Sequence, residues 1–119
     1  MPCRPPTALL LHSISEGLSD GLALEDAVLV EVVYDRPSER FMPSHFVAGF
    51  ISGAQPTRVA GLWAVGITGN GSITALNDAA RELSDWGLAA RPGSTAEKAR
   101  HDALTYPEAR EALDCLESV

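Results

Sequence analysis

Apolar residues recur along the chain at spacings that distinguish helices from strands. Between residues 7 and 18, Leu11, Ile14 and Leu18 return every three or four positions, which predicts a helix. Residues 27–34 are apolar on both faces and rich in β-branched side chains, which is typical of a strand covered on two sides. The first third of the chain is therefore predicted to hold a helix and a central strand.

The middle of the chain is predicted to hold a short helix and a β-hairpin. Residues 58–68 form the second predicted strand. Asn70-Gly71 lies between two β-like runs and is a strong hairpin signal, so we expect residues 61–68 to pair with residues 72–76. Before this hairpin, four apolar residues repeat at helical spacing and predict a short helix: Phe46, Val47, Phe50 and Ile51.

The last third is predicted to be helical. A helix is expected at about 78–86, capped by Asn77 or Asp78. Capping-box sequences then open helices at about 95–104 and 106–117, which form a C-terminal helical hairpin against the domain or against a partner. The apolar stripe of the last helix contains Ala109, Ala112, Leu113 and Leu116.

These elements predict an α+β fold, in which helices pack on a small, mostly antiparallel sheet of about three strands. The 119 residues fit a single domain over 1–119, and the 45% hydrophobic content allows a core to be buried. Residues 1–6 include three prolines and are expected to form an irregular arm.

The charge distribution excludes some partners. The formal net charge is −7, and the acidic residues are spread along the chain. No run of Lys or Arg exists to bind phosphates, so we expect no direct binding of nucleic acid, although an acidic protein can meet a basic partner. No apolar stretch approaches the roughly 18 residues that span a membrane, and the first residues do not form a signal peptide. We therefore expect a soluble, cytoplasmic protein.

Cys3 and Cys115 lie near opposite ends of the chain. They could form a disulfide that ties the termini, or a redox pair, or they could be two unrelated thiols. Because no secretory signal precedes them, we expect unrelated thiols.

Glu31 is the strongest single candidate for catalysis, because it interrupts an apolar strand. Burial would desolvate its carboxylate, as in many general acids and bases. The favoured alternative is that Glu31 is partly exposed, or pairs with an Arg such as Arg58 on a neighbouring strand. His45 is the second candidate, because it follows Ser44 and lies ten residues after Asp35, but nothing beyond residue type supports a triad.

Candidate ligand-binding residues are three aromatics, of which the tryptophans are expected first of all to pack in the core: Tyr34, Trp63 and Trp86. Two helical pairs have the i, i+4 spacing of metal ligands, His12 with Glu16 and Glu97 with His101. Neither has a third ligand nearby in the sequence. We therefore expect neither a metal nor a cofactor.

One short stretch resembles the opening of a PAS-type sensor domain: Gly71-Ser72-Ile73-Thr74-Ala75-Leu76-Asn77-Asp78-Ala79-Ala80, with Leu83 and Trp86. Such domains begin with a hairpin strand and then place Asn and paired Ala at the start of a helix. The resemblance implies a sensor-like domain that binds a small molecule. The residues after Trp86 are too few for the family's further helices and three long strands, so no site residue is carried over.

Two classes of function follow from the sequence. The first is a small interaction or accessory protein that binds a protein partner or forms a homodimer, with Ala109, Leu113 and Leu116 at the interface. The alternative is a small-molecule-binding domain or small enzyme with a pocket near Glu31 and His45.

Overall fold

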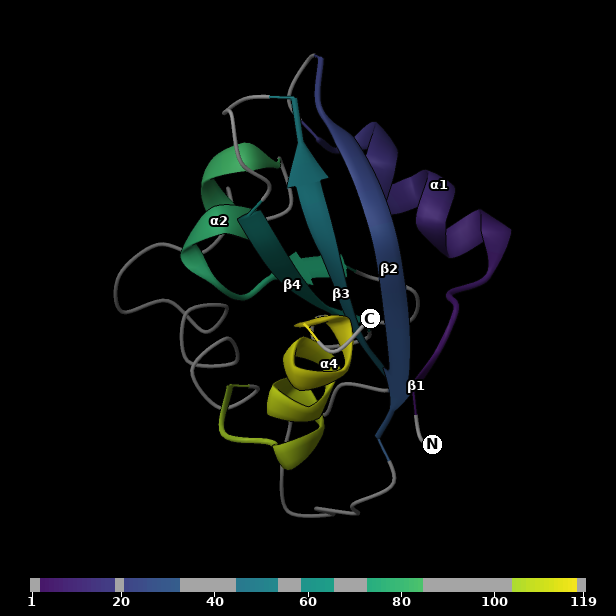
Figure 1. Ribbon diagram of the computed structural model, residues 1–119, viewed down its shortest axis with the longest axis vertical. Helices are drawn as coiled ribbons and strands as arrows, with labels where there is room; N and C mark the ends of the chain where they lie inside the picture. Colours follow the sequence, from purple (N-terminus) through teal and green to yellow (C-terminus); the bar gives the residue numbers. More distant parts are fainter. Residues whose placement is uncertain are drawn as a thin grey trace.

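The computed structural model describes residues 3–18, 21–32, 45–53, 59–65, 73–84 and 104–117. Within this part of the chain, five antiparallel strands form one sheet in the order β1-β2-β3-β4-β5, with three helices around it (Figure 1). The strands are β1 (Cys3–Arg4), β2 (Ala23–Glu31), β3 (His45–Ser52), β4 (Val59–Val65) and β5 (Ile73–Ala75). The helices are α1 (Ala8–Glu16), α2 (Asp78–Leu83) and α4 (Pro107–Glu117).

One face of the sheet is covered by α1 and α2. Leu29, Val47 and Trp63 lie side by side across β2, β3 and β4 in the observed register. Since successive residues of a strand point to opposite faces, their side chains share this α1/α2 face. They form one buried cluster with Ile14 of α1 and Ala80 of α2.

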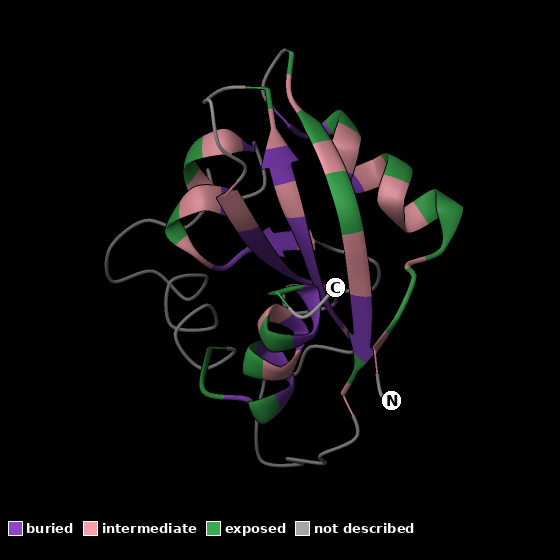
Figure 2. Ribbon diagram, viewed as in Figure 1, coloured by how far each residue is buried: buried purple, intermediate pink, exposed green. Residues whose placement is uncertain are grey.

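The opposite face is covered by α4. Val30, Phe46 and Ala64 form the adjacent row across the same three strands. They are buried together with residues of α4, and the rings of Phe46 and Tyr106 lie 6.0 Å apart. Both faces of the central strands are therefore apolar, which explains why β3 is largely buried whereas exposed residues recur along β2 (Figure 2).

The α+β class is confirmed, but the sheet has five strands and not about three. One added strand is β3, over residues 45–52, where the sequence predicts a short helix. That prediction is wrong because Phe46 and Val47 face opposite helices, so a strand apolar on both faces imitates helical spacing. The other added strand is β1, which lies within the segment 1–6 expected to be irregular.

Several elements agree with the sequence pattern. Thr7 caps α1, and its Oγ1 accepts a hydrogen bond from the Leu10 amide at 3.2 Å. β4 pairs with β5 as the predicted hairpin requires, with Val65 opposite Ile73. The last helix begins and ends close to its predicted limits, but the helix expected at 95–104 lies outside the described residues except for Leu104, so the helical hairpin is not shown.

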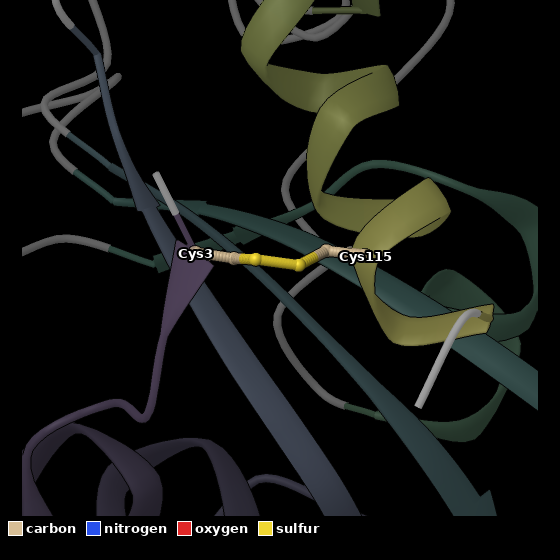
Figure 3. Close-up of a disulfide and its surroundings, with 2 residues drawn as sticks. All are labelled: Cys3 and Cys115. Carbon is tan, nitrogen blue, oxygen red and sulfur yellow. A yellow bond between two sulfur atoms is a disulfide. The ribbon is translucent and has the colours of Figure 1, made fainter. Parts of the chain in front are cut away.

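A disulfide joins Cys3 of β1 to Cys115 of α4 (Figure 3). The expectation of two unrelated thiols is therefore wrong. The two residues are 112 positions apart, but β1 pairs with β2 while α4 packs across β2 and β3, and this brings their Cα atoms to 6.6 Å. That separation is within the range that a disulfide bridges.

The position of β5 and α2 limits the resemblance to a PAS-type domain. A strand and a capped helix do follow one another there, with Asn77 as the cap. However, β5 is the last strand in sequence among the described residues, and the other four precede it.

Among the described residues, no helix is both long and apolar enough to cross a membrane.

Candidate functional site

Glu31, the strongest catalytic candidate from the sequence, is the last residue of β2 and is exposed. Its Oε2 accepts a hydrogen bond from the Arg4 guanidinium at 2.8 Å, and the side chains of Arg4 and Glu31 are 59% and 53% exposed. The carboxylate is therefore solvated and paired with a cation. This agrees with the favoured interpretation of Glu31, but the partner is Arg4 of β1, whereas Arg58 lies outside the described residues.

The structure brings the two catalytic candidates together. Glu31 of β2 and His45 of β3 are direct cross-strand partners, and the same row continues with Val65 of β4 and Ile73 of β5. Directly opposite residues on antiparallel strands have their Cβ atoms about 5 Å apart. His45 is half-buried and Glu31 is exposed, so the pair lies at the surface of the α1/α2 face and not in a water-excluded site.

Of the aromatic candidates for ligand binding, Trp63 is the one that lies within the described residues. Trp63 is fully buried in the core of the α1/α2 face, and its indole N–H donates to Ser84 Oγ at 3.3 Å. The Ser84 hydroxyl in turn donates to the carbonyl of Ala80. Tyr34 and Trp86 lie outside the described residues. Trp63 thus has the structural role that the sequence favours for it.

The predicted interface on the last helix needs correction. Ala109 and Leu116 are 2% and 0% exposed and belong to the core of the α4 face, and half-buried Leu113 packs against the same core. The apolar stripe of α4 is therefore buried within the chain, because it packs against an apolar face of the sheet. The sequence alone did not show where this face lies. A partner could contact these residues only by displacing α4.

Within the described part of the chain, acidic and histidine side chains do not gather into a larger cluster. Nε2 of His12 and Oε1 of Glu16 lie 3.0 Å apart on α1, where both side chains are exposed. Over the described ranges, no three His, Cys, Asp or Glu side chains come together in a way that could hold a metal ion. The pair Glu97 and His101 lies outside those ranges.

The most distinctive surface feature is the outer edge of β2, the side of that strand that faces away from β3. β1 pairs there with Leu29 and Val30 only, and no further strand joins β2 on that side within the described residues. Before this stretch, the register between β2 and β3 shifts between Glu25 and Val28, and Asp26 has a φ of 54°. Such a bulge bends an edge strand and hinders pairing.

The outer edge of β2 is also acidic. The nine residues of β2 include three exposed carboxylates, Glu25, Asp26 and Glu31, and no basic residue. Glu25 accepts a hydrogen bond from the Ser52 hydroxyl of β3 at 3.0 Å, and Glu31 binds Arg4. The strand therefore presents negative charge along an edge that pairs with only a two-residue neighbour.

Sequence reasoning missed Arg4 and β1. The prolines around this dipeptide, Pro2 and Pro5, lack the N–H that a longer strand would need, so the segment carries no strand pattern. A carboxylate that interrupts an otherwise apolar strand was the available signal, because it predicts a basic partner nearby without saying which one.

Comparison of the chain with protein-family models, with curated proteins and with solved structures found no match.

Proposed function

We propose that the protein is an interaction protein that binds a partner protein, and that the partner adds an extended, basic segment to the outer edge of β2. Strand addition of this kind uses main-chain hydrogen bonds for affinity and side-chain contacts for specificity. It needs no pocket, metal or catalytic residue.

The observation that carries this proposal is the way β1 already occupies the edge. Two extended residues pair with Leu29 and Val30, and the second of them, Arg4, binds the Glu31 carboxylate. β1 therefore shows the contacts that an added strand of a partner would make. A partner segment with an Arg in the same place would make the same contacts and could extend along the regular stretch from Val28 to Glu31.

Charge supports a basic partner. β2 has three exposed carboxylates and no basic residue, and the whole chain has a formal net charge of −7. Complementary charge speeds association and suppresses wrong partners. A second copy of the chain fits less well, because two β2 edges would bring like charges together.

The remaining surfaces of the sheet favour this site indirectly. One face of the central strands is covered by α1 and α2, and the other by α4, through the two buried clusters. The apolar stripe of α4, including Ala109 and Leu116, is buried. A strand that joins the sheet must therefore join at an edge, and β2 is longer than β5 at the other edge.

The proposal is tested with the full-length variant Cys3→Ser with Arg4→Ser, which lacks both the disulfide and the Arg4–Glu31 ion pair, so that β1 is held only by its short backbone pairing with β2. The probe is a fluorescent peptide of four Thr-Arg repeats, and the control is a peptide of four Thr-Glu repeats. Fluorescence anisotropy should show saturable binding of the arginine peptide only. Glu31→Gln in the same background should weaken that binding about two- to fivefold at low salt, since one exposed charge pair is lost.

A matched substitution separates the site from general attraction to an acidic protein. Glu82 is exposed on α2 and lies away from β2, so Glu82→Gln removes the same charge elsewhere. Equal weakening by both substitutions, or no saturable binding of the arginine peptide to the folded variant, would contradict strand addition at β2.

A small-molecule site at Glu31 and His45 is the second candidate, and the cross-strand register of these residues favours it. Native mass spectrometry of the chain purified without refolding tests it. A stoichiometric adduct that disappears in Glu31→Gln and His45→Ala would support such a site, and a clean protein mass would count against it.

A further inference from the structure

β1 pairs with the part of β2 that has no bulge to hinder pairing with another strand. From Val28 to Glu31 the pairing of β2 with β3 is regular, and β1 pairs with Leu29 and Val30 in this stretch. The irregular stretch with Asp26 comes before it. An uncovered, regular edge is open to pairing with another chain. β1 therefore guards the segment of the edge that is best suited to bind a strand.

β1 is attached weakly apart from the disulfide. It has two residues, and proline on either side prevents a longer ladder. The Arg4–Glu31 pair is more than half exposed, and exposed ion pairs add little stability. The covalent bond from Cys3 to Cys115 is thus the main restraint that keeps β1 in place.

The packing of α4, which carries Cys115, does not depend on the disulfide. α4 buries Ala109, Ala112 and Leu116 against the sheet, and Tyr106 just before the helix is buried in the same cluster. Breaking the disulfide would therefore free β1 and leave α4 packed on its face. Cys3 is half-buried, whereas Cys115 is buried, so Cys3 is the sulfur that a reductant reaches more easily.

We propose that the Cys3–Cys115 disulfide is a redox latch on the outer edge of β2, a proposal that rests on the function proposed above. In the oxidised chain, β1 occupies the edge as an internal ligand. A dithiol reductant attacks the Cys3 sulfur, the S–S bond breaks, and resolution of the mixed disulfide leaves two thiols on this chain and a disulfide on the reductant. Two electrons and two protons move from the reductant to this protein. Released β1 then yields the edge to the basic segment of the partner.

The proposed redox latch also bears on the cellular compartment in which the protein is expected. Stable disulfides are typical of oxidising compartments, whereas those in the cytosol are mostly transient and redox-sensing. A permanently closed disulfide would argue against the expected cytoplasmic location, but a latch that opens on reduction is compatible with it.

The test compares peptide binding by the oxidised and reduced wild-type chain. The probe is the same fluorescent peptide of four Thr-Arg repeats, measured by anisotropy with and without dithiothreitol. We expect reduction to tighten binding about tenfold or more, because β1 no longer competes at the high effective concentration of a tethered segment. Without peptide, amide hydrogen exchange should rise on reduction at whichever of Leu29 and Val30 points its N–H toward β1, and it should fall again when peptide is added.

The control is the full-length variant Cys3→Ser with Cys115→Ser, which should bind as the reduced chain does under both conditions. Equal binding by the oxidised and reduced wild type would overturn the latch, while binding by the Cys3→Ser, Arg4→Ser variant would still support the site itself. Global unfolding on reduction, seen as exchange throughout α4 and loss of near-ultraviolet circular dichroism, would also overturn the latch.

Discussion

At the residue scale, Asn77 joins α2 to the sheet. Its Oδ1 accepts hydrogen bonds from the amides of Ala80 at 3.0 Å and Leu62 at 3.1 Å, and its Nδ2 donates to the carbonyl of Ala60 at 2.9 Å. The sequence predicts a cap at this position or at Asp78, but only the structure shows that the same side chain also bonds to β4. A cap that uses both ends of an amide is harder to replace than an ordinary one.

Replacing Asn77 tests this double role. Asn77→Ala should lower the free energy of unfolding by about 2–3 kcal/mol, from the lost cap and the lost bonds to β4. Asn77→Asp should cost less, because it keeps an acceptor for the Ala80 amide and loses only the donor to Ala60. Urea denaturation measures both values. A cost below about 0.5 kcal/mol for Asn77→Ala would show that these bonds contribute little.

The close approach of the Trp63 indole explains why residue 61 is a glycine. A Cβ added at Gly61 would lie 2.5 Å from Trp63 Cη2, and one added at Gly49 would lie 2.5 Å from Leu24 Cδ1. The Trp63 indole is fully buried, whereas the Leu24 side chain is half-buried and flexible.

Gly61→Ala should therefore destabilise the protein by about 1–3 kcal/mol through overpacking, and Gly49→Ala should cost less because Leu24 can move aside. Thermal unfolding followed by Trp fluorescence measures the difference. If Gly49→Ala cost as much as Gly61→Ala, the rigidity of the indole would not be the cause.

At this scale the sequence indicated roles better than partners. It favoured a surface, ion-paired Glu31 and a core Trp63, and both roles agree with the structure. It did not indicate Arg4 or Ser84 as their partners, because pairing between β1 and β2 and the approach of α2 to β4 are long-range contacts. Such contacts leave no periodic pattern in either segment.

At the element scale, β3 was predicted as a helix because it is covered on two sides. β3 is apolar on alternate residues toward both the α1/α2 face and the α4 face, so its sequence has no period of two. The elements with one buried side, α1 and α4, were predicted close to their observed limits. The hydrophobic pattern alone therefore does not separate a strand that is apolar on both faces from a short buried helix.

The same reasoning changes the role of the α4 stripe from interface to core. Leu116→Ala should lower the free energy of unfolding by about 2–5 kcal/mol, as expected for a fully buried Leu, and Leu113→Ala should cost less because Leu113 is half-buried. Neither substitution should change the assembly state that native mass spectrometry reports. A change of assembly state with unchanged stability would restore the interface interpretation.

At the scale of the whole molecule, the disulfide closes almost the entire chain, since its residues are 112 positions apart. Cross-linking of a long loop reduces the entropy of the unfolded chain. The Cys3→Ser, Cys115→Ser variant should therefore be less stable by about 2–5 kcal/mol in chemical denaturation. The wild type should match the variant when reduced and exceed it when oxidised. Equal stability of the oxidised wild type and the variant would show that the disulfide does not constrain the unfolded chain.

The arrangement of layers then decides where a partner can bind. Helices cover both faces of the sheet, and β1 covers only Leu29 and Val30 along the outer edge of β2 (Figure 1). The acidic residues of β2 give that edge the negative charge on which the proposed selection of basic segments rests. The proposed binding surface is thus a strand edge.

Residue-resolved amide hydrogen exchange would show whether a basic segment adds to the outer edge of β2. The full-length Cys3→Ser, Arg4→Ser chain is compared with and without the peptide of four Thr-Arg repeats. Strand addition should raise protection within residues 23–31 and leave it unchanged in α4 and β5. Protection confined to α2 or α4, or none in β2 at saturating peptide, would contradict it.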